Sequence, residues 1–339
     1  MGVLHLTTGS GKTILSAEII RRMKIKTLFI TPRIELNRQT VRTFNRTLGI
    51  ECREISEGKF EDGDVCVATF QTIMALLKRD KKTMVKFLES IGLLIVDEAH
   101  ISASKSFMII GSYLKNTVKR IGLTGTLNQR ADGNDMKVEA LLGKEIYKFK
   151  QEALNSGFLA NANIVFYKID NEDSDCYEYQ EEYQEFNVEN ELRNNKIKDL
   201  ANKVHKDKSI LILTNRIEHS NKLGELIGCP VITGGTNSKE RKEIFEKFTK
   251  GDIRVMVGSL QIFQLGIDIP ELDVIINCSG LSAPISCIQT LGRVLRKGGA
   301  KSTGYYIDFI DENTKYLKGA SWKRFSTLKK EGHKPRIAE

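Results

Sequence analysis

The stretch GVLHLTTGSGKT, residues 2–13, joins an apolar run to a loop with two glycines and then to the start of a helix. Backbone N–H groups of such a loop and of the helix N-terminus can surround a phosphate group, and Gly9 and Gly11 allow a close approach. Lys12 can reach the β- and γ-phosphates of a nucleotide, and the Thr13 hydroxyl can bind Mg²⁺. A tight strand-to-helix turn also needs glycine, but it explains neither Lys12 nor Thr13. The stretch therefore predicts a nucleotide-binding α/β domain.

Short apolar runs recur along the chain, and stretches of helical periodicity separate them. Such runs are typical of parallel strands buried on both faces and linked by right-handed helical crossovers. In the first half they cover residues 2–6, 26–31, 64–69, 93–96 and 120–124, and in the second half residues 163–168, 209–214, 230–233, 254–258, 273–277 and 304–309. We therefore predict two parallel α/β sheets of similar plan.

The chain of 339 residues exceeds the usual size of one hydrophobic core, so two domains are expected. The stretch QEALNSGFLANA, residues 151–162, interrupts the pattern with Asn, Ser and Gly. We place the hinge there.

Composition limits the possible partners. A net charge of +9, from 52 basic and 43 acidic residues, permits a polyanionic partner without indicating one. No apolar run approaches the roughly 20 residues that span a bilayer, and the N-terminus lacks a charged leader, so neither a membrane partner nor secretion is expected. The six cysteines form no C-x-x-C pair, which favours reduced thiols in the cytoplasm, or in the host cytoplasm if the chain is phage-encoded.

Two charged segments flank the second series of strands. Residues 171–191 carry nine acids and no base, with Cys176, Tyr179, Tyr183 and Phe186 at helical spacing. We expect an acidic helix with one packed face rather than a partner site. The basic tail, residues 315–336, has Trp322, Phe325 and Leu328 three apart and is also expected to be a solvated helix packed by those three side chains.

The stretch LLIVDEAH, residues 93–100, ends an apolar run in two acids. Beside a phosphate loop, Asp97 can hold Mg²⁺ through water, and Glu98 can orient and deprotonate an attacking water molecule. A strand that ends in a solvated acidic turn is the alternative, which the phosphate loop makes the weaker one.

Together these motifs resemble those of superfamily 2 helicases, in the branch shared by type III restriction motors and phage helicases. The resemblance rests on the loop at 7–13, DEAH at 97–100 and QTLGRVLR at 289–296. It continues in the same order through TPRIELNRQ (31–39), VATFQTI (67–73), LTGT (123–126), LILTNRIEH (211–219), ITGGTNSKERKEIFEKF (232–248) and VGSLQIFQLGIDIP (257–270).

The resemblance implies an α/β fold of two tandem RecA-like P-loop domains with parallel sheets and a nucleotide site in the interdomain cleft. The ATP-binding domain would cover residues 1–155. The C-terminal helicase domain, with the basic tail, would cover residues 156–339. Closure on ATP followed by hydrolysis would give the domains two alternating spacings, which can step along a strand.

The resemblance also assigns roles to individual residues. Nucleotide binding would fall to Thr8, Gly9, Ser10, Gly11, Lys12, Thr13, Gly266 and Asp268, and Mg²⁺ binding to Thr13 and Asp97. Catalysis would involve Lys12, Asp97, Glu98, Gln289, Arg293 and Arg296, because a guanidinium at the transferred phosphate is worth about 10³ to 10⁵ in rate. His100, Thr124 and Thr126 would couple hydrolysis to domain movement. Nucleic acid would contact Pro32, Arg33, Thr69, Gln71, Asn215, Arg216, Gly235 and Ser259, although Thr69 and Ser259 could simply end strands and Arg33 could be a solvated loop residue.

We therefore expect a nucleic-acid-dependent ATPase that uses ATP and Mg²⁺ and acts as a DNA helicase or translocase, with DNA favoured over RNA. The alternatives are an ATP-gated clamp that does not separate strands and the motor part of a nuclease complex. A monomer is expected, with an accessory protein as a further partner.

Some positions depart from the family pattern. Leu6 replaces the usual Ala or Gly, Thr7-Thr8 replaces Pro-Thr, and Ser259 replaces Thr. Family members normally carry an adenine-recognising segment before the phosphate loop, and six residues precede it here. From this pattern ATP and GTP are expected to differ little as substrates.

Overall fold

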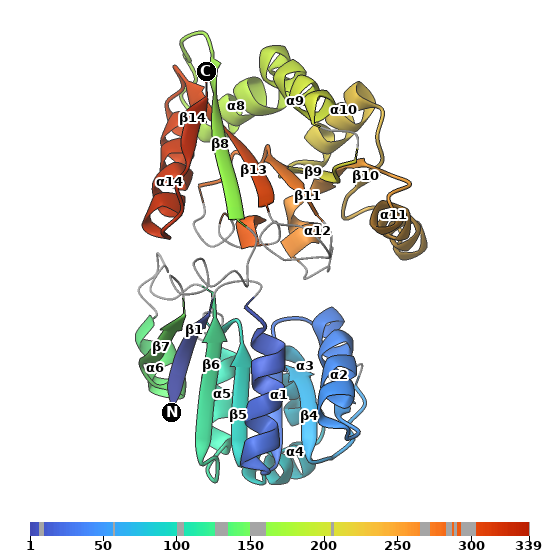
Figure 1. Cartoon of the computed structure of the whole chain (residues 1–339). Coiled ribbons are helices and arrows are strands. Elements are labelled where there is room, and N and C mark those ends of the chain that lie inside the picture. The colour runs from blue at the N-terminus through green and yellow to red at the C-terminus, as the bar shows by residue number, and fades with distance from the viewer. Residues whose placement is uncertain are drawn as a thin grey trace. The chain divides into compact units, whose positions relative to one another are not determined.

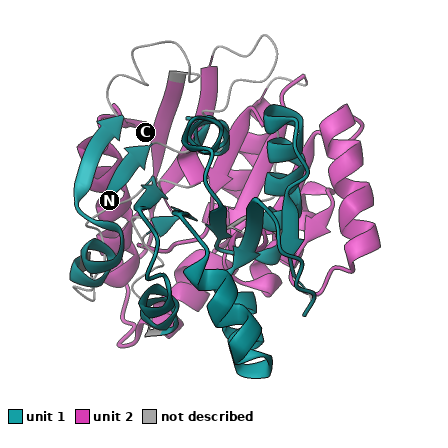
Figure 2. Ribbon diagram, turned by 90° about the horizontal axis from the view of Figure 1, so that it is seen from below, with its two compact units in different colours: residues 1–152 teal, residues 153–339 magenta. Residues whose placement is uncertain are grey.

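The structure is a computed structural model that describes residues 1–6, 10–56, 58–99, 105–125, 135–149, 161–204, 207–264, 272–282, 287, 290–292 and 303–338. The chain divides into two compact units, residues 1–152 and 153–339, which Figure 2 colours teal and magenta. The predicted hinge at residues 151–162 lies outside the described residues as far as residue 160. Each unit is described by itself.

The first unit is a seven-stranded parallel sheet with helices on both faces (Figure 1). Neighbouring strands follow the order β3-β4-β2-β5-β6-β1-β7. The elements are β1 (Gly2–Leu6), α1 (Lys12–Met23), β2 (Thr27–Thr31), α2 (Ile34–Leu48), β3 (Arg53–Ile55), β4 (Val65–Thr69), α3 (Phe70–Arg79), α4 (Lys81–Glu89), β5 (Leu93–Asp97), α5 (Lys105–Tyr113), β6 (Lys119–Thr124), α6 (Asp135–Leu142) and β7 (Glu145–Phe149).

The second unit is also a seven-stranded parallel sheet, in the order β10-β11-β9-β12-β13-β8-β14. Its elements are β8 (Asn161–Asp170), α8 (Tyr179–Tyr183), the π-helix η2 (Gln184–Glu189), α9 (Glu191–Lys203), β9 (Ile210–Thr214), α10 (Ile217–Ile227), β10 (Val231–Ile232), α11 (Ser238–Lys250), β11 (Val255–Ser259), α12 (Leu260–Gln264), β12 (Val274–Asn277), β13 (Thr303–Glu312), α14 (Tyr316–Lys330) and β14 (Arg336–Ala338). Adding seven to each strand number of the first sheet reproduces this order, so the predicted similarity of plan is confirmed.

Alternate strand residues of the first unit enter two cores. Phe29 of β2 and Ile95 of β5 pack with Ala17 and Ile20 of α1 and Phe44 of α2. On the opposite face, the intervening residues of the same strands pack with apolar side chains of α3, α4, α5 and α6. Both faces are therefore buried, which explains why the central strands are apolar throughout.

Sequence periodicity misses three strands, β3, β7 and β14, and each lies at an edge of its sheet. In β7 the first four residues are exposed, and β14 is mostly exposed as well. An edge strand need not be apolar on both faces, so it lacks the continuous hydrophobic run that marks a central strand. The fourth edge strand, β10, is more apolar, and its run at residues 230–233 predicts it.

The acidic segment is helical over a shorter range than predicted. Its helices, α8 and η2, cover only residues 179–189. The packed face is confirmed, because Tyr183 and Phe186 are buried in a cluster with Leu317 of α14. Glu182 is fully buried as well, although it is not one of the four residues that the sequence places on the packed face.

Glu182 caps helix α14. Its carboxylate accepts hydrogen bonds from the backbone N–H groups of Lys315 at 2.7 Å, Tyr316 at 2.8 Å and Leu317 at 2.7 Å. These groups have no partner inside the helix, and the helix dipole favours a negative charge there. A buried charge of this kind is stabilised by its hydrogen bonds rather than by water.

Helix α14 carries the three tail residues as predicted, but they are buried to different extents. Leu328 is fully buried, whereas Trp322 is 37% exposed. The Phe325 ring lies 5.5 Å from that of Trp322 and 5.2 Å from that of Phe166, between ring centroids.

All six cysteines are free thiols. Burial raises the pKa of Cys66 to about 11 and that of Cys278 to about 12. None of the helices that the structure describes has the length and apolar character needed to cross a membrane.

Candidate active site

The N-terminus of α1 forms one side of the candidate site. Gly11 has φ +79° and ψ 29°, a left-handed conformation that favours glycine, and no side chain caps the helix that begins at Lys12. The Ser10 hydroxyl is buried and has no hydrogen-bond partner among the described residues. The uncapped N–H groups and this hydroxyl suit an anionic ligand. Thr8 and Gly9 lie outside the described residues.

An ion pair joins α1 to the end of β5. The Lys12 ammonium nitrogen lies 2.9 Å from Glu98 Oε1, and these side chains are only 12% and 21% exposed. Glu98 directly succeeds β5 and has φ +50°, which is uncommon for a residue with a Cβ. The structure therefore brings together a lysine and a glutamate separated by 86 residues of sequence. It also holds the glutamate in an unfavourable backbone conformation.

Asp97 is the second acid of this cluster. Burial raises the pKa of Asp97 to about 6, and the neighbouring Glu98 carboxylate also raises it. Lys12 lowers the pKa, and so does the Glu98 N–H, which donates to Asp97 Oδ1 at 3.0 Å. The cluster thus holds two acids and one lysine, and an added cation would favour the ionised aspartate.

Mg²⁺ fits this cluster as a nucleotide-bound ion. Among the described residues, no group of three or more His, Cys, Asp or Glu side chains is arranged to hold a metal. Mg²⁺ is usually bound by one or two carboxylates together with phosphates and water, so it does not need such a group. Thr13, in the first turn of α1, and Asp97 are the protein groups available to it.

A histidine that no sequence motif marks links the strands beside the phosphate loop. His5 is buried in β1. Its Nδ1 lies 3.0 Å from Glu145 Oε2, and its Nε2 lies 3.1 Å from the Gly125 carbonyl oxygen. Gly125 comes directly after Thr124, the buried end of β6 and a predicted coupling residue. Glu145 and Gly125 lie 140 and 120 positions after His5, so no local sequence pattern predicts these contacts.

The predicted nucleic-acid residues of the first unit lie where adjacent strands end. Pro32 and Arg33 come after β2, Thr69 ends β4, and Gln71 lies in the first turn of α3. Because Thr31 is in register with Thr69, these strand ends are level. The Thr69 side chain is buried and accepts a hydrogen bond from the Thr72 N–H at 3.2 Å, so it caps α3.

The second unit repeats this arrangement. Asn215 and Arg216 come after β9, Ser259 ends β11, and Gly235 lies in the turn after β10. Thr214 is in register with Ser259, and Ser259 is only 4% exposed.

Arg216 is held by the acidic segment. Its guanidinium donates to Gln184 Oε1 at 2.6 Å and to Gln180 Oε1, and it lies 5.0 Å from the centroid of the Tyr183 ring. Such a contact could not be found from local periodicity, because the partners lie 32 and 36 residues away.

Two family matches cover most of the chain. Residues 1–129 match the family described as "Type III restriction enzyme, res subunit", and residues 193–298 match "Helicase conserved C-terminal domain". The chain belongs to the superfamily 2 helicases. Within them it falls in the branch of the type III restriction subunits.

Curated relatives that are similar to this superfamily 2 helicase are themselves named as helicases. It is 28% identical over 306 residues to the protein named "DNA 3'-5' helicase XPB" of Mycobacterium tuberculosis, covering 87% of this chain and 55% of that protein. It is 26% identical over 350 residues to "ATP-dependent DNA helicase uvsW" of phage T4, covering 95% and 67%. The chain thus spans about half the length of the mycobacterial relative.

Solved structures support the tandem RecA-like fold. A fragment of a putative HsdR subunit of a type I restriction enzyme from Vibrio vulnificus is 17% identical, with a TM-score of 0.73, and the match covers 99% of this chain and 64% of that one. Yeast Dbp5 bound to RNA and ADP BeF3 is also 17% identical, with a TM-score of 0.65, covering 99% and 85%.

Nine of the predicted site residues of this superfamily 2 helicase lie outside the described residues: Thr8, Gly9, His100, Thr126, Gly266, Asp268, Gln289, Arg293 and Arg296.

Proposed function

We propose that this chain is a nucleic-acid-stimulated ATPase that moves along DNA and separates its strands. The Lys12–Glu98 pair carries the proposal, because it places the lysine of the phosphate loop against the acid immediately after β5. A lysine for phosphate and an acid for water are the two groups that ATP hydrolysis requires of one domain.

The residues of the first unit would hold both ATP and Mg²⁺. The N–H groups at the start of α1 would contact phosphates, helped by the unpartnered Ser10 hydroxyl. Thr13 and Asp97 would bind Mg²⁺. The bound ion supplies charge stabilisation at the transferred phosphate.

Lys12 and Glu98 would change partners when nucleotide binds. Lys12 would exchange the Glu98 carboxylate, now 2.9 Å away, for phosphate oxygens. Glu98 would then be free to orient a water molecule and accept its proton. The pair therefore keeps the base occupied until substrate is present.

Residues of the second unit would complete the reaction. By family resemblance, Gln289, Arg293 and Arg296 would contact the transferred phosphate, and Gly266 and Asp268 would contact the nucleotide. Because these groups belong to the second unit, hydrolysis would depend on the approach of the two units. Repeated approach and separation would move the enzyme along a strand.

DNA is proposed over RNA because the mycobacterial and phage relatives are both named DNA helicases. Several relatives are further named 3'-5' enzymes, and we extend this polarity to the chain. The predicted contacts offer donors to phosphates, so binding should tolerate any sequence and weaken with salt.

Parallel assays test the proposal. ATPase rates would be measured with single-stranded, duplex and forked DNA and with RNA, and strand displacement on substrates with 3′ or 5′ tails. We expect stimulation by DNA and displacement from 3′ tails. ATP hydrolysis without strand release would favour a clamp, and no stimulation by any nucleic acid would refute the proposal.

A second candidate function is the motor part of a nuclease complex. The first family match favours it, because the description of that family names a subunit of a restriction enzyme. A translocation assay that detects movement along duplex DNA without strand separation would support this candidate.

A further inference from the structure

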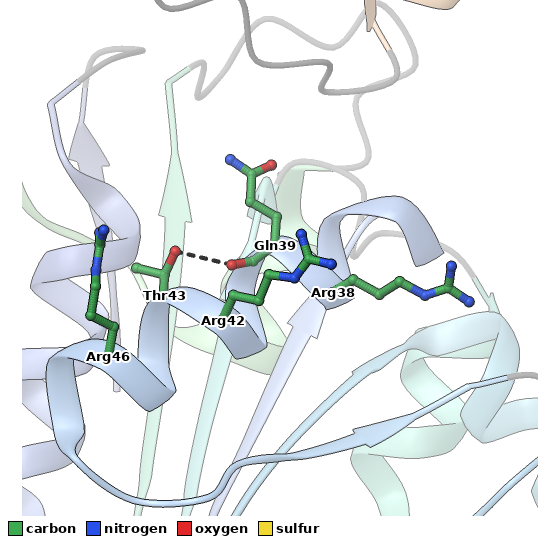
Figure 3. A pocket seen from close by; sticks show the side chains of 5 residues that line it. All are labelled: Arg38, Gln39, Arg42, Thr43 and Arg46. Atoms are coloured by element: carbon green, nitrogen blue, oxygen red, sulfur yellow. Dashed lines mark hydrogen bonds between the residues drawn. The ribbon is translucent and has the colours of Figure 1, made fainter. Parts of the chain in front are cut away.

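A row of arginines runs along helix α2 of the first unit. Arg38, Arg42 and Arg46 recur every four residues, and all three are exposed. Together with Gln39 and Thr43 they line a surface hollow (Figure 3). We call these five residues the α2 arginine stripe.

The arginines of the α2 arginine stripe outnumber the acids of the helix. Helix α2 has one acid, Glu35 in its first turn, and the rest of the helix contains no Asp or Glu. Each arginine of the stripe has another arginine four positions away. Like charges at this spacing destabilise a helix. Helix α1 differs, because there Glu18 pairs with both Arg21 at 2.7 Å and Arg22 at 2.6 Å.

The three arginines differ in their partners within the first unit. Arg38 Nε lies 3.9 Å from Glu54 Oε1, at the limit of an ion pair. Neither Arg42 nor Arg46 forms an ion pair with a described residue. The guanidinium groups of Arg42 and Arg46 are therefore available for an external anion.

The stripe is not needed to attach α2 to the sheet. Phe44 is fully buried on the other side of the helix, and its ring centroid lies 5.1 Å from that of Phe29 in β2. Asn37 is also fully buried there. Helix packing thus rests on residues outside the stripe, so packing does not explain the arginines.

The spacing of the stripe suits a regular polyanion. Four helical residues rise about 6 Å, so the three arginines span roughly 12 Å. This length corresponds to three or four base pairs of a duplex, whose axial rise is about 3.4 Å per pair. A planar guanidinium can also bind a phosphate through two parallel hydrogen bonds.

The chemistry of the hollow favours a duplex over a single strand. Single strands are usually held by aromatic side chains that stack on the bases, in addition to basic groups. None of the five lining residues is aromatic. In a duplex the bases face inward and the phosphates outward, so arginines alone are sufficient.

We propose that the α2 arginine stripe binds the phosphate backbone of duplex DNA. This rests on the proposed function and goes beyond it, because the strand-end residues Pro32 and Arg33 would contact the translocated strand. Helix α2 begins at Ile34, directly after them. The stripe would extend the contact along the helix onto paired DNA ahead of or behind that strand.

The test uses the full chain with the triple substitution Arg38→Gln, Arg42→Gln and Arg46→Gln. Fluorescence anisotropy would measure binding of a short duplex and of a single strand across a salt series. We expect duplex affinity to fall roughly 10- to 100-fold. The slope of log affinity against log salt should lose about 3, close to one per phosphate contact removed. Single-strand affinity and nucleic-acid-independent ATPase activity should change less than about twofold.

Two further variants separate this role from folding and from general charge. Arg21→Gln with Arg22→Gln removes exposed positive charge from α1 and should leave the duplex slope within about one of the parent. The triple substitution Arg38→Lys, Arg42→Lys and Arg46→Lys keeps the charge, so the slope of log affinity against log salt should be unchanged. Duplex affinity should still fall, because the planar guanidinium is lost. The melting temperature of the glutamine triple should be equal or higher, since like-charge repulsion is removed.

The outcomes are distinguishable. An unchanged duplex slope in the glutamine triple, with DNA-stimulated ATPase intact in the parent, would overturn the stripe and leave the proposed function standing. Equal loss of single-strand and duplex binding would overturn the duplex assignment. A parent that binds no nucleic acid would overturn both proposals, and selective loss of binding to anionic vesicles would point to a lipid surface instead.

Discussion

The two units share one sheet order and differ in what their central strands carry. In the first unit β5 ends in Asp97 and leads into Glu98, whereas its counterpart β12 ends in Asn277 and leads into Cys278. Asn277 donates its amide to Asp308 at 2.9 Å and to the Tyr306 hydroxyl oxygen at 3.0 Å. The same fold position thus holds two acids of the candidate site in one unit and a hydrogen-bonded amide in the other.

Buried charges differ in the same way. In the second unit Arg324 donates to Asp308 at 2.8 Å, and Arg193 lies 2.7 Å from Asp311, with the arginine and aspartate side chains almost wholly buried. Among the described residues of the first unit, Asp97 and Glu98 lie beside one lysine, Lys12. Buried pairs of opposite charge hold a structure in place, whereas two neighbouring acids beside one lysine favour a cationic ligand.

A local motif shows the common framework beneath this difference. Thr31 Oγ1 hydrogen bonds to the Arg33 carbonyl oxygen at 2.9 Å and to Asn37, two and six residues on. Thr214 hydrogen bonds to the Arg216 carbonyl oxygen at 3.4 Å and to Ser220 Oγ at 2.6 Å, at the same offsets. A buried threonine therefore orders the strand-end turn in both units, whereas the contacts of the arginine in that turn differ between them.

The largest expected effect is on the acid after β5. Glu98→Gln should lower ATP turnover by about 10³-fold while nucleotide binding remains, because the amide keeps the shape but cannot accept the proton of water. Steady-state ATPase assays and titration with a fluorescent nucleotide would measure the two. Glu89→Gln, an acid at the end of α4, is the control and should be near normal. Near-normal turnover in Glu98→Gln would remove this residue from the mechanism.

The second effect tests whether the second unit contributes to catalysis. Arg296→Ala should reduce hydrolysis by more than about tenfold without preventing nucleotide binding, because an arginine at the transferred phosphate acts mainly in the transition state. Arg22→Ala, which is 75% exposed on α1, is the control. Full activity of the Arg296 variant would remove this arginine from the mechanism.

The third prediction concerns the structural carboxylate of the second unit. Glu182→Ala should lower the free energy of unfolding by about 3 kcal/mol, because three backbone N–H groups lose a buried charged acceptor. Urea unfolding would measure this, with the exposed Glu181→Ala as control. The free energy should fall without a matching loss of turnover at low temperature. A large loss of turnover in folded protein would contradict the view that Glu182 is structural whereas Glu98 is catalytic.

The smallest effect is a pH dependence that comes from a buried histidine of the second unit. His219 of α10 occupies the place of Leu36 in α2, and burial lowers the pKa of His219 to about 3. Because the pKa in the unfolded chain is near 6.5, the unfolded state binds the proton first as pH falls. The contribution of His219 to stability is thus complete above about pH 6.5, and about 1–2 kcal/mol of this contribution should be lost from pH 7 to pH 5.

His219→Leu introduces the residue type that the first unit has at the equivalent position. It should reduce the change in unfolding free energy between pH 7 and pH 5. Urea unfolding at several pH values would compare it with the parent. An unchanged slope between pH 7 and pH 5 would show that other groups cause it.

Local sequence patterns are sufficient to predict the central strands and the two motifs that meet in the first unit. Strands β2, β4 and β9 are buried along their whole length, so their apolar runs are visible without a structure. The phosphate loop and the acids after β5 are also visible, because their chemistry demands particular residues at short spacing.

Features that depend on distant partners come from the tertiary structure. Edge strands such as β7 form because a neighbouring strand offers its backbone, which requires no hydrophobic pattern of their own. Glu182 is buried at the helix that begins 134 residues after it, and His5 contacts Glu145 on the neighbouring strand β7. Sequence periodicity reports only which face of an element is buried. It does not report which charge or backbone group lies opposite that face, and this is where the two units become different.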